Sequence, residues 1–346
     1  MAVSTNRRNV YRLAMAGLVA ALVAAIITAS IVGAAGLSVG EAFRSLFALF
    51  TPGPAATGDF PSWAPRLMLS LRLPRIALAL IAGAALSTSG AAFQGVFRNP
   101  LAEPYLLGVS AGAALGATIA IVWKPLSSLG IYTVPILAFV GAVLAAFLVY
   151  RLATFSGRTS GASLLLSGVA VGSTLTAVTS FLMVATERDL HTVVVWLMGG
   201  VTTATWMKVY ITLPIVAAGF LYMYLMSRRM NLLLMGEDRA RELGVDSQRT
   251  RRNVMVVAAL TTAAAVAFTG LIGFVGLMVP HIMRLVVGPD HRRLLPATAL
   301  FGALLLLLAD TVARTALAPA EIPVGIITAA VGGPFFLYLL RARKGA

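Results

Sequence analysis

Ten long apolar stretches, separated by short polar or glycine- and proline-marked segments, dominate this sequence. A membrane-spanning helix needs about 20 mostly apolar residues because the hydrocarbon core of a bilayer is about 30 Å thick. We therefore predict an all-α polytopic membrane protein in which residues 1–346 form a single transmembrane domain. The ten predicted spans lie at about residues 13–35, 73–91, 105–123, 132–150, 162–185, 208–226, 253–270, 272–287, 296–313 and 324–340.

The composition supports a membrane protein and excludes several other classes. Hydrophobic residues make up 59% of the chain and charged residues 11%, whereas a soluble domain carries about 25% charged residues. The net charge of +15 does not indicate a nucleic-acid partner, because basic residues at helix ends also orient membrane proteins during insertion. The chain has no cysteine and three histidines, so we expect neither a disulfide nor a metal or other cofactor bound by the chain itself.

Two segments decide the number of spans. A single helix over residues 253–285 would be about 50 Å long at 1.5 Å per residue, and Gly270 and Gly273 lie where a turn is needed. We therefore predict two spans there. The segment 192–206 is short, contains a glycine pair and is framed by tryptophans, so we expect it at the membrane surface.

The distribution of positive charge predicts the orientation. With ten spans, the side that holds both termini carries 19 of the 27 lysines and arginines, as cytoplasmic segments do. The first apolar stretch follows Arg7, Arg8 and Arg12, but it is too long for a signal peptide and is predicted as the first span. The second and seventh spans then enter from opposite faces, as inverted repeats of spans 2–5 and 7–10 require.

Residues 227–252 form the longest polar segment on the predicted cytoplasmic side. Glu237 and Asp238 are placed to begin a short helix, Arg241 lies near its end, and Gly244 is a natural stop. Apolar residues interrupt the charges. The pattern fits an amphipathic helix that lies on lipid headgroups, or a helix that docks a partner.

Three arginines lie on the opposite side, where the orientation rule leaves few positive charges. Arg72 and Arg75 precede and open the second span, and Arg314 follows the ninth. They could extend to the membrane interface, or Arg314 could pair with Asp310 one turn earlier. Alternatively, they form a cluster that binds carboxylates of an external partner.

Glycines recur every four residues in two of the predicted spans. This spacing puts them on one helix face, where helix backbones can approach closely. The residues are Gly108, Gly112, Gly116, Gly168 and Gly172.

Several motifs are missing from the sequence. It contains no nucleotide-binding G-x-x-x-x-G-K-[ST], no catalytic Ser/His/Asp set and no H-E-x-x-H, so we expect neither enzymatic activity nor ATP hydrolysis by this chain alone. Asp310 and Glu321 lie near span ends, and the lack of mid-span carboxylates disfavours a proton-coupled transporter. His281 and His291 are predicted to be ordinary interface residues.

A series of ordered motifs runs along the sequence. They include Leu71–Arg75, Gly95–Gly112, Trp196–Gly200, Ala240–Gly244, Gly270–His281 and Gly333–Leu337. In these motifs the sequence resembles the FecCD family of permeases, which belong to type II ABC importers of cobalamin, heme and ferric siderophores. The resemblance covers residues 65–340.

This resemblance implies a permease subunit in the bacterial inner membrane that imports a large metal chelate from periplasm to cytoplasm. It implies a homodimer of ten-span subunits, two ATPase subunits that bind ATP and Mg, and a periplasmic or lipid-anchored binding protein. A secondary transporter or a membrane scaffold without an ATPase is the competing reading. The sequence does not choose among ferric siderophore, heme and cobalamin.

The resemblance also implies roles for individual residues. Arg72, Arg75 and Arg314 would meet acidic residues of the binding protein, and Asn99 and Leu101 would form a cytoplasmic gate. A second gate position would fall at Gly161 or Ala162, with Thr159 and Ser160 displaced from the family register. The ATPase-coupling residues within 227–252 would be Met230, Asn231, Gly236, Glu237, Ala240, Arg241, Leu243 and Gly244.

Overall fold

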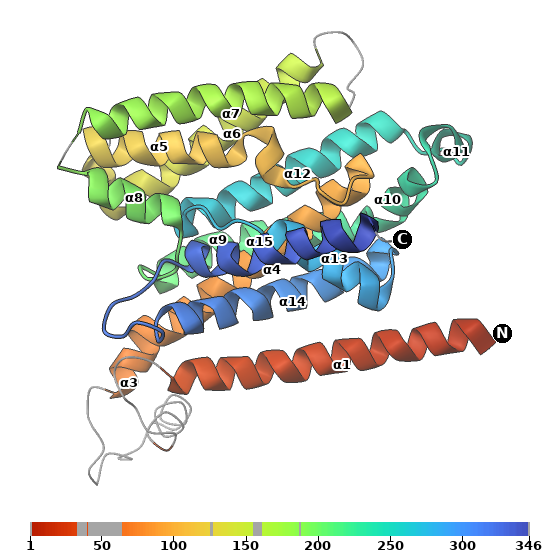
Figure 1. Ribbon diagram of the computed structural model, residues 1–346, viewed down its shortest axis with the longest axis horizontal. Coiled ribbons are helices and arrows are strands. Elements are labelled where there is room, and N and C mark those ends of the chain that lie inside the picture. The colour runs from red at the N-terminus through yellow and green to blue at the C-terminus, as the bar shows by residue number, and fades with distance from the viewer. Residues whose placement is uncertain are drawn as a thin grey trace.

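The computed structural model describes residues 2–32, 40, 64–124, 127–154, 161–186 and 188–344, and these ranges form an all-helical bundle (Figure 1). Its ten apolar helices correspond one to one with the ten predicted stretches. They are α1 (Ala2–Ile31), α4 (Leu73–Phe97), α5 (Val109–Trp123), α6 (Thr133–Ala153), α7 (Gly161–Val184), α9 (Trp206–Leu225), α12 (Ser247–Thr269), α13 (Val275–Val287), α14 (His291–Ala313) and α15 (Val324–Lys344). Within the described ranges, seven are long and apolar enough to cross a membrane, and α5, α13 and α15 have shorter apolar parts.

Short helices mark the two ends of the bundle. Figure 1 shows both chain termini at the same end of the bundle as α10 and α11, which we call the α10–α11 end, while α3 and α8 lie at the opposite end, the α8 end. The short elements are α3 (Ala64–Leu67), the π-helical turn η1 (Met68–Arg72), the 3-10 helices η2 (Pro104–Leu107) and η3 (Ser127–Tyr132), α8 (Leu190–Met198), α10 (Ser227–Leu234) and α11 (Glu237–Glu242).

The two segments that decided the span count fold as predicted. The chain leaves α12 at Thr269 and enters α13 at Val275, and Gly270 takes a positive φ of 66° in the break. Helix α8 has nine residues, too few to cross a bilayer. Val193 is its one buried residue, and the chain that follows α8 is fixed to the end of α12, because the Gly200 amide donates to the Thr269 carbonyl at 2.7 Å.

The helix contacts repeat between the two halves of the chain. Helix α4 packs on α14, and α12 packs on α6, so the second span meets the ninth and the seventh meets the fourth. Both α5 and α13 are short and follow an irregular segment. The two irregular segments touch, since the Tyr105 hydroxyl donates to the Ile272 carbonyl at 2.9 Å. This pattern is the one that inverted repeats of spans 2–5 and 7–10 would produce.

Glycines allow the closest helix crossings. A Cβ at Gly90 of α4 would overlap the carbonyl of Gly276 in α13. Gly112 and Gly116 face the α6 backbone in the same way, and Gly168 faces the Leu106 carbonyl. Of the other glycines singled out from the sequence, Gly108 begins α5 with a positive φ of 74°. Gly172 has open space around it.

Candidate functional site

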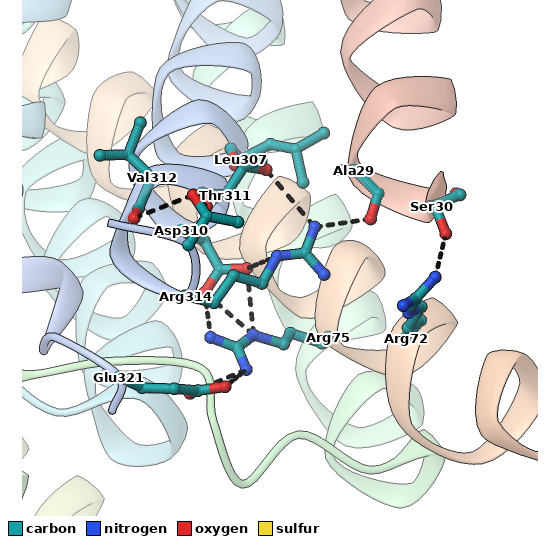
Figure 2. A network of polar contacts seen from close by, with 11 residues as sticks. Ala29, Ser30, Arg72, Arg75, Leu307, Asp310, Thr311, Val312, Arg314 and Glu321 are labelled. Carbon is teal, nitrogen blue, oxygen red and sulfur yellow. Dashed lines mark hydrogen bonds and ion pairs between the residues drawn. The ribbon is translucent and has the colours of Figure 1, made fainter. Parts of the chain in front are cut away.

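A buried ionic network lies at the α8 end, where α4 begins and α14 ends (Figure 2). Arg75 of α4 donates from Nε and Nη2 to Asp310 of α14, at 3.0 and 2.8 Å. The same guanidinium donates from Nη1 to Glu321 at 2.9 Å. The Asp310 side chain is 0% exposed, so its charge depends on Arg75 for compensation.

The other two predicted docking arginines hold the end of α1. Arg314 Nη2 donates to the Ala29 carbonyl at 2.6 Å, and Arg72 Nη1 donates to the Ser30 carbonyl at 2.7 Å. Both side chains are buried. Arg314 Nε also lies 3.9 Å from Asp310, which is the one-turn pair considered from the sequence. Both carbonyls belong to the last turn of α1, where carbonyls have no N–H partner within the helix. The two guanidiniums therefore cap the C-terminal end of α1.

The structure thus brings Arg72, Arg75 and Arg314 together but engages all three within the chain. The three guanidiniums and the two carboxylates of Asp310 and Glu321 together carry one net positive charge, although only Arg75 and Arg314 lie within ion-pair distance of a carboxylate. Arg72 Nη2 has no hydrogen-bond acceptor among the described residues. The Glu321 side chain is 36% exposed, against 11% for its partner Arg75.

The opposite end carries the segment that the sequence singled out for docking. It forms two helices, α10 and α11, separated at Gly236, whose φ is 113°. Met230 and Ala240 are fully buried, whereas Leu243 at the tip is 59% exposed. Arg241 and Gly244 are exposed beside it. The predicted short helix with Glu237 and Asp238 in its first turn is α11.

Asn231 joins α10 to the spanning helices. Its Nδ2 donates to Asp290 Oδ1 at 2.6 Å, and its Oδ1 accepts from the His291 backbone amide at 2.9 Å. The His291 ring lies against Gly95 of α4, where a Cβ would overlap it. His291 is therefore buried at 1% exposure rather than an interface residue as the sequence suggested. We call this contact set the Asn231 junction.

Glu237 fixes α11 to two neighbouring elements. Its carboxylate accepts from Arg251 Nη2 of α12 and lies 3.8 Å from Arg98 at the end of α4. The hydrogen bond from Arg251 and the charges around it lower the pKa of Glu237. Both short helices are thereby held against the ends of spanning helices.

A family model described as the FecCD transport family matches residues 18–342. The chain belongs to the FecCD transport family. Its match to the cobalamin import system permease of Halobacterium salinarum is 52% identical and covers 82% of this chain and 76% of the relative. The hemin transport system permease of Yersinia pestis is 40% identical, with 80% and 84% covered. The ferric dicitrate permease of Escherichia coli is 39% identical, with 79% and 85% covered.

Solved structures agree with this assignment. An inward-facing metal-chelate type ABC transporter matches with a TM-score of 0.80 and 34% identity, over 95% of this chain and 98% of that one. A complex from Streptococcus pneumoniae, with a TM-score of 0.55 and 15% identity, shares the fold. The chain is therefore an integral membrane transport component of the FecCD family.

In this FecCD chain, the predicted gate residues lie in a turn at the α10–α11 end. Asn99 Oδ1 accepts from the Leu101 amide at 2.9 Å, and the Leu101 side chain is 52% exposed. A cavity of about 160 Å³ separates Asn99 from Gly161 at the start of α7. Ala162 is exposed beside it, and Thr159 and Ser160 lie outside the described residues.

Glu103 lies in the same turn and was not singled out from the sequence. It is partly buried, and within the described part of the chain no side chain pairs with its carboxylate. Burial raises its pKa to about 7. Its only sequence signal is an acid between two helix-stopping prolines.

The exposed face of α7 differs from that of the other outer helices of this FecCD chain. It presents the hydroxyl residues Ser173, Thr174, Thr176 and Ser180 among apolar side chains such as Leu166, Val169 and Phe181. The exposed side chains along α6, by contrast, are apolar up to Arg151 in its last turn. Since hydroxyls gain little from contact with lipid tails, this face of α7 suits water or another protein surface.

Metal binding by the chain finds no support in the residues that the structure describes. No group of three or more His, Asp or Glu side chains comes close enough to hold an ion.

Proposed function

We propose that this chain is the membrane permease subunit of an ATP-driven importer that moves a metal chelate from the periplasm to the cytoplasm. The Asn231 junction is the observation that carries the proposal. A short, partly exposed helical unit is useful to a transporter when it is rigidly linked to helices that must move. Asn231 provides that link, because it bonds α10 to the start of α14.

The energy would come from partner subunits. Two ATPase subunits would bind ATP and Mg, and a cleft in each would receive the α10–α11 unit of one permease chain. Leu243 and Met235, which are exposed on this unit, would contact the ATPase. When the ATPases close, the push on α10 would pass through Asn231 to α14 and through His291 to Gly95 of α4. A rocking motion of packed helices would then open one end of the pathway and close the other.

The pathway would run between two copies of the chain. The hydroxyl-bearing face of α7 would line it or meet the second copy, and Asn99 and Leu101 would close its cytoplasmic side. Such a surface has few groups that could bind a cargo tightly. We therefore expect weak contact with the chelate, as passage requires.

The binding protein would dock at the α8 end. The network of Arg72, Arg75 and Arg314 has one net positive charge, which attracts acidic residues of a partner. The buried guanidiniums would act mainly through their electric field and by shaping this surface. The cap that Arg72 and Arg314 place on α1 is a second role for the same residues.

The cargo class follows from the relatives. They are named as permeases for cobalamin, hemin and ferric dicitrate, all of them metal chelates, so we propose a cargo of this class. The membrane would be the bacterial inner membrane. The α10–α11 end and both termini would face the cytoplasm, because that side carries most of the positive charge.

The test is reconstitution with the ATPase and binding protein encoded beside this chain. We expect ATP-dependent uptake of one chelate, stimulated several-fold by the loaded binding protein. Deletion of residues 236–244 should leave folded protein that no longer couples ATP hydrolysis to uptake. Uptake that proceeds without an ATPase would overturn the proposal and support a secondary transporter.

A further inference from the structure

A basic cavity lies at the α10–α11 end, between the last turns of α6 and the first turn of α12. Its volume is about 240 Å³, and its walls include Arg249, Arg251 and Arg252 together with Tyr150 and Gln248. Asp246 is the one acidic residue in its lining. Three guanidiniums and one carboxylate give the lining a formal charge of +2, and the Glu237 carboxylate that Arg251 binds outside the lining reduces the net charge to +1.

The hydrogen bonds around the cavity leave donors without acceptors. Both carboxylate oxygens of Asp246 already have a partner. Oδ1 accepts from the Arg249 amide and so caps α12, and Oδ2 pairs with Arg249 Nε at 3.0 Å. Arg251 bonds Glu237 through Nη2, yet its buried Nε has no acceptor in the described part of the chain. Arg252 is exposed, and its recorded hydrogen bond is a long one of 3.3 Å to Asn253.

An anion would satisfy these donors. A phosphate group is tetrahedral, and a pair of its oxygens matches the two parallel N–H donors of a planar guanidinium. The guanidiniums of Arg249 and Arg252 are exposed, so an anion can reach their donors, and binding would neutralise positive charge. The cap on α12 is already made by Asp246, so the attraction arises from the guanidiniums rather than from the helix end.

The surroundings of the cavity favour a lipid over a free anion. The exposed face of α6 leads to the cavity and is apolar from Ile136 through Leu144 to Phe147, over whose ring Arg151 lies in the last turn. Val256 of α12, one turn from Arg252, is also exposed. A ligand that lies here meets charge at one end and a hydrocarbon-facing surface along the rest.

We propose that this cavity binds an anionic phospholipid. Its phosphate contacts Arg249, Arg251 and Arg252, and its acyl chains lie along α6 toward Leu144. Tyr150 and Gln248 are placed to bond the glycerol or headgroup oxygens. A zwitterionic lipid brings its own positive charge into a cavity that is already positive, so anionic lipids bind preferentially.

The experiment uses the full-length protein in mild detergent and the double substitution Arg249→Gln with Arg252→Gln, which keeps the Arg251–Glu237 pair. Native mass spectrometry measures retained lipid, and thermal unfolding is followed with added phosphatidylglycerol, phosphatidylcholine or inorganic phosphate. The matched control is Arg292→Gln with Arg341→Gln, which removes the same charge from exposed residues at the same end.

We expect wild type and control to retain phosphatidylglycerol and to unfold at a higher temperature when it is added. The cavity variant should retain it roughly tenfold less, and phosphatidylcholine should have little effect on any of the three. Equal retention by all three proteins would overturn the proposal.

Two other results would also overturn it. If inorganic phosphate alone reproduced the full stabilisation, the ligand would be a free anion. If the cavity variant kept its lipid but lost the co-purifying ATPase, the cavity would be a protein contact.

Discussion

Arg75 binds both carboxylate oxygens of Asp310, with Nε at 3.0 Å from one and 3.1 Å from the other. The two residues are 235 positions apart, so this one pair fixes the start of α4 to the end of α14. Because Asp310 is fully buried, the contact compensates a charge that water cannot reach. The same guanidinium extends the link to Glu321, which precedes α15.

Arg75→Met should destabilise the protein by about 3–5 kcal/mol, because it leaves the buried Asp310 carboxylate unpaired. The double substitution Arg75→Met with Asp310→Leu should recover most of this loss, since an apolar pair replaces a charged one. Thermal unfolding in detergent measures both. If the single variant unfolds at the wild-type temperature, Asp310 is not held by Arg75.

Gly90→Ala should destabilise the bundle by about 3 kcal/mol, because the new methyl overlaps the Gly276 carbonyl and helices cannot separate without losing contacts. Gly172→Ala is the matched control on another spanning helix, since the space around it is open. The unfolding temperatures of the two variants give the comparison. Equal values would mean that the α4–α13 crossing can relax.

Asn231→Ala should reduce the amount of cargo moved per ATP hydrolysed, while the ATPase still co-purifies. The substitution removes the bonds to Asp290 and His291 but leaves the exposed tip unchanged. Leu243→Ala serves as the contrast, since it should weaken ATPase association instead. Uptake and hydrolysis are measured together in liposomes. An unchanged ratio in the Asn231 variant would mean that force does not pass through this junction.

Glu103→Gln should stabilise the protein at about pH 8 and leave it unchanged at about pH 4. Burial raises the pKa of Glu103 from 4.5 to about 7, so the folded state keeps a proton that the unfolded state has released. Stability from this group is therefore full below about pH 4.5 and is lost as the pH rises to about 7, by on the order of 1–3 kcal/mol.

Glu237→Gln provides a control of opposite sign for the Glu103 measurement. The Arg251 hydrogen bond lowers the pKa of Glu237, so its contribution is present above about pH 4.5 and falls in acid. The variant should therefore be destabilised at about pH 8 and approach wild type in acid. Unfolding temperatures across the pH range separate the two groups, and parallel curves would contradict both assignments.

Much of the fold could be predicted from the sequence because lipid imposes a strong local rule. Each span must be a run of apolar residues long enough to cross the bilayer, and all ten runs became helices. The break at Gly270 and the short helix that begins at Glu237 were readable for a similar reason. A glycine or an acidic first turn acts on its immediate neighbours.

The candidate site could be predicted less completely from the sequence, because its contacts join residues that are distant along the chain. Arg72, Arg75 and Arg314 were recognised as a group, but the carbonyls of Ala29 and Ser30 that two of them cap have no sequence signal. Asn231 lies 59 positions from Asp290. Only the packing of α10 against α14 shows that its side chain points into the protein.

The contact between Tyr105 and Ile272 bears on how the chain can fold. The Tyr105 hydroxyl donates to the Ile272 carbonyl and accepts from its amide, so the first half supplies partners for backbone groups exposed by the break in the second. In a membrane, such groups left bare cost several kcal/mol each. Neither half is therefore complete alone, and a chain divided within residues 227–246 would yield two fragments that gain stability only by recombining.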